Sequence, residues 1–347
     1  MNNFAFLRLL AALFVVVSHV SPLLGRGPEL SALGLIGVTM FFAISGFLVT
    51  QSWDRDQNAI RFLTRRALRI FPGLLSSIFA CAFVIGPLVT HFTLSEYFSS
   101  PVFFKFCRNI ILFPIKFSLP GVFTENPFKG AVNGSLWTLP MEVTMYLILV
   151  AAASKRLWTT RNIFLFATLL FALELYLFKN WRISESPHIL TMNAQQLTLS
   201  GISFMAGAIL AKIRENVFRM RNCVPMLIII LATHQHTIVT IIIVLFVPYM
   251  SICFGKKHTK ALRNADKFGD LSYGIYIYAF PIQQLSVYLS PSINIYYFTI
   301  ISIFIPAAAA FISWHIIERP ALKFKPVALP TQQSASNHEL VIIDSPK

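Results

Sequence analysis

Long apolar runs, separated by short polar segments, make up most of this chain. A helix needs roughly 20 apolar residues to cross a bilayer core of about 30 Å, and most of the runs approach that length. They predict ten transmembrane helices, at residues 4–24, 31–53, 70–90, 137–154, 162–179, 196–211, 222–233, 237–254, 271–290 and 293–317. The pattern therefore predicts an all-α fold, a polytopic transmembrane helical bundle with both termini on one side of the membrane.

The composition leads to the same class of protein. Of the 347 residues, 56% are hydrophobic and only 12% are charged. A soluble domain could not cover so much apolar surface with polar groups. The four cysteines show no CxxC spacing, so neither a disulfide framework nor a zinc site is predicted.

The basic residues are distributed unequally between the two sides of the predicted bundle. With ten crossings, 22 of the 29 Lys and Arg residues lie on the side of the N-terminus and 7 lie on the other side. Cytoplasmic loops of membrane proteins carry such an excess. We therefore expect both termini in the cytoplasm. The net charge of +15 is explained in this way, and no nucleic-acid partner is predicted.

The chain is predicted to hold one integral-membrane domain, residues 1–325, and a polar, disordered cytoplasmic tail, residues 326–347. Residues 222–255 are uncharged and are interpreted as two crossings joined at the sequence HQHT, because a single crossing would place the basic segment KKHTKALRNADK outside.

In the largest external segment, prolines interrupt an apolar piece. We expect residues 108–120 to lie on the membrane surface or re-enter it rather than cross it.

Two ionisable side chains lie in the first apolar run, RLLAALFVVVSH. Arg8 and His19 are eleven residues apart, so on a helix they share one face and lie about 16 Å apart along the axis. Ionisable side chains within a membrane usually face the protein interior or a cavity and mark a functional site. From these residues alone, Arg8 could equally be an anchor at the membrane surface and His19 a buried structural residue.

Further motifs favour the functional interpretation. The R-x10-H spacing is followed by GVTMFFAISGFLVT, RRALRIFP, NGSLWTLPMEVTMYL and LSYGIYIYAFPIQQ, in this order, over residues 4 to about 320. This set closely resembles the acyltransferase-3 family of bacterial integral-membrane O-acyltransferases, whose helical core usually has ten crossings. The resemblance implies that His19 is the catalytic general base and that Arg8 faces an acyl-CoA donor. Imidazole suits this role because it gains and loses protons near neutral pH.

The RRALR sequence contains Arg66 and Arg69, which are three residues apart and share a face if this segment is helical. Guanidinium groups bind phosphate through paired hydrogen bonds. The resemblance matches both residues to the family's RxxR motif and implies that they bind a phosphate of coenzyme A. Without it, the preference of cytoplasmic loops for basic residues would account for the cluster.

Four more positions are candidate site residues. The resemblance makes Glu142 a catalytic residue that either orients His19 or accepts hydrogen bonds from a sugar, and we expect it near the outer end of the fourth helix. Asn133 and Trp137 are substrate-binding candidates from the same motif, although Trp137 could be only an interfacial anchor. Ser45, beside Gly46, is a weaker candidate, since small residues commonly allow close helix packing in membranes.

Other polar and aromatic residues receive structural interpretations. Tyr273 and Tyr276 are expected to pack against neighbouring aromatic side chains. His234 and His236 form an HxH sequence in an external turn, and no third ligand is near in sequence, so no metal site is predicted.

The sequence thus predicts a multi-pass protein of the bacterial inner membrane. It would move an acetyl or other short acyl group from acyl-CoA to a hydroxyl of a surface polysaccharide, lipopolysaccharide or exopolysaccharide, or of a lipid-linked precursor. A separate periplasmic transferase or polysaccharide-assembly machinery is a candidate partner. Two alternatives remain open at this point: a transporter or exporter of a polysaccharide precursor or small molecule, and a structural subunit of an assembly complex.

Overall fold

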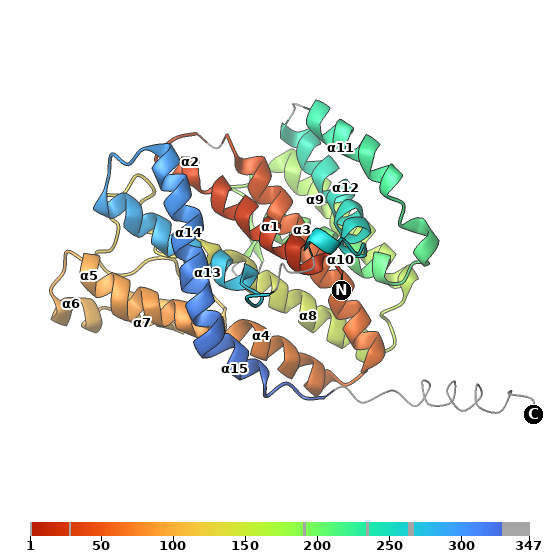
Figure 1. Cartoon of the computed structure of the whole chain (residues 1–347), viewed down its shortest axis with the longest axis horizontal. Coiled ribbons are helices and arrows are strands. Elements are labelled where there is room, and N and C mark those ends of the chain that lie inside the picture. Colours follow the sequence, from red (N-terminus) through yellow and green to blue (C-terminus); the bar gives the residue numbers. More distant parts are fainter. Residues whose placement is uncertain (1, 28, 190–191, 234–235, 263–266, 328–347) are drawn as a thin grey trace, which may run out of the picture.

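The structure is a computed structural model and describes residues 2–27, 29–189, 192–233, 236–262 and 267–327, with the side chains of His236 and Thr237 excepted. The chain folds into a bundle of helices (Figure 1). The described part also contains a single two-stranded hairpin. The predicted all-α class is therefore confirmed. The predicted tail, residues 326–347, lies almost wholly outside the described residues.

The helices follow one another along the chain with short connections. They are α1 (Phe4–Ser18), α2 (Val20–Leu23), α3 (Ser31–Arg55), α4 (Ala59–Phe79), α5 (Gly86–Val89), α6 (Leu94–Ser99), α7 (Pro101–Cys107), α8 (Thr138–Ser154), α9 (Thr160–Asn180), α10 (Ala194–Ala211), α11 (Cys223–Ala232), α12 (His236–Gly255), α13 (Ser272–Leu289), α14 (Ile295–Ser313) and α15 (Arg319–Leu322). The strands β1 (His188–Ile189) and β2 (Met192–Asn193) pair antiparallel.

Each of the ten predicted runs contains a helix. Eight helical segments of the described chain are long and apolar enough to cross a membrane: Phe4–Leu23, Ser31–Arg55, Ala59–Val89, Gly134–Ser154, Thr160–Asn180, Ala194–Ala211, Ile238–Gly255 and Ile295–Leu322. The other two predicted crossings correspond to α11, which is short, and to α13, which carries many polar side chains. The structure therefore describes a multi-pass membrane protein.

The third helical segment differs most from its predicted bounds. The apolar pattern predicts a helix over residues 70–90, whereas the helix begins at Ala59. The Asn58 side chain caps it by accepting a hydrogen bond of 2.9 Å from the backbone N–H of Arg61. The first turns are basic, so hydropathy misses them, yet they are helical and place the RxxR residues on a regular helix.

Asp56 lies just before this helix and neutralises its basic beginning. Its carboxylate accepts hydrogen bonds from Arg61, at 3.0 and 2.5 Å, and from Arg65, at 2.7 Å. These hydrogen bonds, from Arg61 above all, outweigh the effect of burial and lower the pKa of Asp56 to about 2. The connection between α3 and α4 is therefore fixed by charge pairing.

Helices α3 and α10 approach one another closely through glycines. A Cβ atom on Gly46 would collide with the backbone of Phe204, and one on Gly207 would collide with the backbone of Ala43. Such contacts need residues without side chains at the crossing. The packing role expected for the small residues of the FFAISGFL sequence is therefore present at Gly46.

The segment between α5 and α8, which was predicted to be external, contains no helix long enough to cross a membrane. Residues 108–120 form a short 3-10 turn and then irregular chain, which the Asn109 amide closes by pairing with the backbone of Lys116 at 2.6 and 2.7 Å. Farther along, Asn126 donates to the side chain of Gln284 on α13, at 2.8 Å. The segment is thus attached to the end of α13.

Candidate active site

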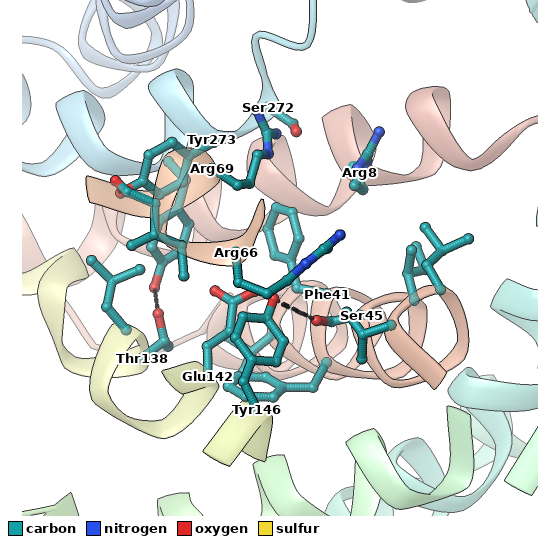
Figure 2. A pocket seen from close by; sticks show the side chains of 18 residues that line it. Arg8, Phe41, Ser45, Arg66, Arg69, Thr138, Glu142, Tyr146, Ser272 and Tyr273 are labelled. Atoms are coloured by element: carbon teal, nitrogen blue, oxygen red, sulfur yellow. Dashed lines mark hydrogen bonds between the residues drawn. The ribbon is translucent and has the colours of Figure 1, made fainter. Parts of the chain in front are cut away.

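One pocket brings together five of the site residues expected from the sequence. Arg8 of α1, Ser45 of α3, Arg66 and Arg69 of α4, and Glu142 of α8 all line it (Figure 2). The pocket holds about 880 Å³ of space, counting its open mouth. Residues that are far apart in sequence therefore form a single polar site within the bundle.

Two of the three pocket arginines share an acidic partner. Arg69 Nη2 lies 2.7 Å and Arg8 Nη2 lies 2.9 Å from the same atom, Oδ2 of Asp270. The other carboxylate oxygen of Asp270 accepts a hydrogen bond of 2.6 Å from Ser272. Burial by itself would raise the pKa of Asp270, but the charges of Arg69 and Arg8 outweigh it and lower this pKa to about 2.

Arg66 is held differently. It forms no ion pair with any described residue, and its guanidinium lies 5.7 Å from the centre of the Phe62 ring. The Nε atoms of Arg66 and Arg8 are both buried without a hydrogen-bond partner among the described residues. A buried donor without an acceptor is unfavourable, so these groups are suited to a ligand rich in acceptor oxygens.

Glu142 lines the same pocket, with Tyr146 one helical turn away. The Tyr146 hydroxyl donates a short hydrogen bond to Glu142, and it lies 3.0 Å from the hydroxyl of Ser45, which itself lies 3.5 Å from Glu142 (Figure 2). Glu142 lies in the second turn of α8, and it shares a pocket with Arg8 of α1. Within the described residues it does not hydrogen-bond His19.

Three further residues that line the pocket contact one another. The hydroxyls of Thr138 and Tyr276 are hydrogen-bonded at 2.7 Å, between α8 and α13. The ring of Phe41 packs edge-on against Tyr276, with 5.8 Å between ring centres. Tyr276 therefore combines the expected aromatic packing with a polar contact at the pocket.

His19 lies outside the residues that line this pocket, at the junction of α1 and α2. Its ring packs edge-on against Phe280, at 5.3 Å between centres, about one turn beyond Tyr276 along α13. The Nδ1 atom of His19 is buried and has no hydrogen-bond partner among the described residues. Gln283, which donates to the carbonyl of Val16 at 3.0 Å, likewise has a buried Oε1 without a described partner.

The remaining two candidates lie away from the pocket lining. Asn133 is fully buried, and its amide donates to Ser77 Oγ at 3.1 Å and to the carbonyl of Ile277 at 3.0 Å. Trp137 is half-buried and packs against the main apolar core. In this structure Asn133 joins α4 to α13, and the substrate-binding role of both residues stays a prediction.

The structure adds Asp270, Tyr146 and Thr138 to the candidates. Asp270 stands immediately before the LSYGIYIY sequence. An acidic residue at the start of a helix, in a chain with 29 basic and only 14 acidic residues, is the signal that could have identified it.

No group of three or more metal-ligating side chains occurs in the described part of the chain. His234 lies outside that part.

Fold and pocket together define the class: a multi-pass membrane protein with a basic pocket suited to an anionic ligand. The family model for the acyltransferase domain of the acyltransferase-3 family matches residues 1–314, and the chain belongs to this family. The resemblance in the motifs is thereby confirmed, and the protein is a membrane O-acyltransferase. The family is one of enzymes, which speaks against the transporter and structural-subunit alternatives.

Two relatives show the extent of the similarity. An O-acetyl transferase of Shigella phage Sf6 is 30% identical over 335 residues, which are 92% of this chain and 95% of the relative. Nodulation protein 10 of Rhizobium leguminosarum bv. viciae is 37% identical over 160 residues, 43% of each chain. No solved structure matches this chain.

Proposed function

We propose that this protein moves an acetyl or other short acyl group from acyl-CoA to a sugar hydroxyl, in the bacterial inner membrane. The acceptor would be a surface polysaccharide, lipopolysaccharide or exopolysaccharide, or its lipid-linked precursor. The observation that carries the proposal is the convergence of Arg8, Arg66 and Arg69 in one pocket. The phosphates of coenzyme A carry negative charge and acceptor oxygens, which the arginines of this pocket can bind.

The distribution of charge supports entry of the donor from the cytoplasm. The pocket arginines lie on the first half of α1 and the first half of α4, and the first turns of α4 are basic. Such clusters of basic residues at the end of an apolar helix are typical of the cytoplasmic side. Acyl-CoA could therefore reach the pocket without crossing the membrane.

His19 is the proposed general base. One nitrogen of its ring would take the proton of the sugar hydroxyl while the hydroxyl oxygen attacks the thioester carbonyl carbon. A carbon–oxygen bond forms, the carbon–sulfur bond breaks, and the imidazolium returns the proton to the coenzyme A thiolate. A buried Nδ1 without a described partner fits a group that gains its partner only when substrates are bound.

Tyr276 contacts Phe41 and Thr138, and along α13 it lies between Ser272, which lines the pocket, and Phe280, which packs against His19. We infer that these three side chains form a layer between the arginines and His19. Arg8 and His19 are about 16 Å apart along α1. A donor whose phosphates lie at the arginines would therefore extend its acyl end through this layer. We propose that these three side chains line the route of the thioester, and that Glu142 and Ser45 contact it on the way.

The acceptor class is proposed from the family resemblance, and the O-acetyl transferase of Shigella phage Sf6 supports acetyl as the transferred group. A separate periplasmic transferase or the polysaccharide-assembly machinery would supply or receive the glycan.

The test uses bacterial membranes that contain the full chain, with acetyl-CoA labelled in the acetyl group. His19→Ala should lower incorporation of label into glycan by about 10²-fold or more, the usual contribution of a general base. His315→Ala is the matched control, because His315 is exposed and its Nδ1 lies 2.9 Å from the carbonyl of Phe311 in its own helix. Normal acetylation by His19→Ala would refute the mechanism.

A further inference from the structure

Asp270 is the one acidic side chain that contacts two of the pocket arginines in the described structure. We propose that Asp270 is a positioning residue, which holds Arg8 and Arg69 side by side as a paired site for a phosphate group of the donor. This inference rests on the proposed function, since it assigns the pocket to a phosphate-bearing donor.

The contacts of Asp270 bring two distant helices together. Arg8 on α1 and Arg69 on α4 donate to the same oxygen atom, at 2.9 and 2.7 Å, so their guanidinium groups are held within a few ångströms of each other. Ser272 holds the second oxygen at 2.6 Å and thereby fixes the rotation of the carboxylate. The carboxylate is thus oriented before any ligand arrives.

The backbone at Asp270 is also fixed. Gly269 has a φ of +103°, a backbone conformation that residues other than glycine rarely adopt. A Cβ atom there would also collide with the indole of Trp314. The same indole lies 5.9 Å from the guanidinium of Arg69, and the ring of Tyr273 lies 5.8 Å from it. Asp270 and Arg69 therefore meet in a rigid arrangement of glycine and aromatic rings.

Electrostatics explains why the two arginines need this partner. Like charges repel strongly in a site with few water molecules, so two neighbouring guanidinium groups would move apart. One carboxylate between them reduces the charge of the group from +2 to +1 and keeps them together. Each guanidinium carries five N–H donors and gives only part of them to Asp270. Arg8 Nε remains buried without a described acceptor, so the pair can still bind an anion.

The chain provides a matched control. Asp56 also pairs two arginines, Arg61 and Arg65, but neither lines the pocket. Asp56→Asn therefore removes the same kind of charge pairing without changing the proposed donor site.

The experiment measures binding of coenzyme A to the purified full chain, and the kinetic constants for acetyl-CoA. In Asp270→Asn the Kd for coenzyme A and the KM for acetyl-CoA should rise about tenfold or more, the effect of one charge-assisted hydrogen bond, while kcat changes less than about twofold. Asp270→Glu should restore part of the affinity, and Asp56→Asn should bind like the natural protein.

Two outcomes would overturn the inference. If the Asp270→Asn variant binds coenzyme A as tightly as the natural protein, or more tightly, the carboxylate does not position the arginines. If Asp270→Asn does not fold, Ser272→Ala replaces it, because it removes the side-chain hydrogen bond to the carboxylate and leaves the charge of Asp270 in place. An unchanged KM in Ser272→Ala would then count against the inference.

Arg66→Ala separates this inference from the proposed function. If Arg66→Ala weakens coenzyme A binding and Asp270→Asn does not, the donor site stands and only the role of Asp270 is wrong. If the natural protein does not bind coenzyme A, or if Arg66→Ala binds it unchanged, the donor site itself is wrong, and the role of Asp270 falls with it.

Discussion

The guanidinium of Arg69 and the carboxylate of Asp270 form an ion pair of 2.7 Å between residues 201 positions apart in the chain. The pair connects α4 to the residues just before α13, and Arg69 itself lines the pocket proposed for the donor. Because the aspartate is charged only above its pKa, the connection depends on pH.

The stability of the protein in acid should depend on the charges of Asp270 and Asp56. Both pKa values are lowered to about 2 in the folded protein, against about 3.9 for an ordinary aspartate. A lowered folded-state pKa adds stability that is present above about pH 4 and is lost as the pH falls through about 2. We expect the unfolding temperature of the detergent-solubilised protein to fall over this window.

Asn variants test the assignment of this acid transition. Asp270→Asn and Asp56→Asn should each be less stable than the natural protein at pH 6, and the difference should become smaller toward pH 2. Parallel curves for the natural protein and both variants would mean that neither carboxylate contributes.

Arg66 should be sensitive to replacement even by lysine. Arg66→Lys keeps the charge but loses the planar group that binds two oxygens at once. We expect the KM for acetyl-CoA to rise about tenfold, with kcat nearly unchanged, since one charge-assisted hydrogen bond is lost. Arg61→Lys, which changes a residue outside the pocket, should leave KM as it is; equal effects of the two substitutions would argue against a specific role.

Glu142 should affect turnover more than binding. Glu142→Gln keeps the size of the side chain but removes the charge that accepts hydrogen bonds from Tyr146 and Ser45. We expect kcat to fall about 10²-fold, the scale of a lost proton-transfer or positioning group. The matched control is Glu174→Gln, a buried glutamate that pairs with Thr198 away from the pocket. An active Glu142→Gln enzyme would exclude a catalytic role.

The crossing of α3 and α10 should not tolerate a methyl group. Gly207→Ala would place a Cβ atom against the backbone of Ala43, which cannot move without displacing α3. We expect a loss of about 1–3 kcal/mol, as for other overpacked cores. It can be measured as a lower unfolding temperature in detergent.

Gly201 on the same helix is the control. A Cβ atom there would lie 2.9 Å from a methyl group of the Leu170 side chain, which can rotate away. Gly201→Ala should therefore be much less harmful than Gly207→Ala. Equal stability of the two variants would mean that the two helices do not pack as described.

The sequence alone determined the class of the protein, because its causes are local. The length of an apolar run decides whether a helix can span a bilayer, and every predicted run contains a helix. The spacing of Arg66 and Arg69 places them on one face of any helix, and both do line the pocket. The order of the motifs was sufficient to identify the family.

Which side chains meet was decided only by the tertiary structure. Arg8 and Arg69 share Asp270, and Glu142 pairs with Tyr146 and Ser45 rather than with His19. Asn133 joins α4 to α13 instead of lining the pocket. Each of these contacts depends on the rotation and depth at which two apolar helices pack. A uniformly apolar run contains little information on either, because lipid and protein interior both accept its side chains.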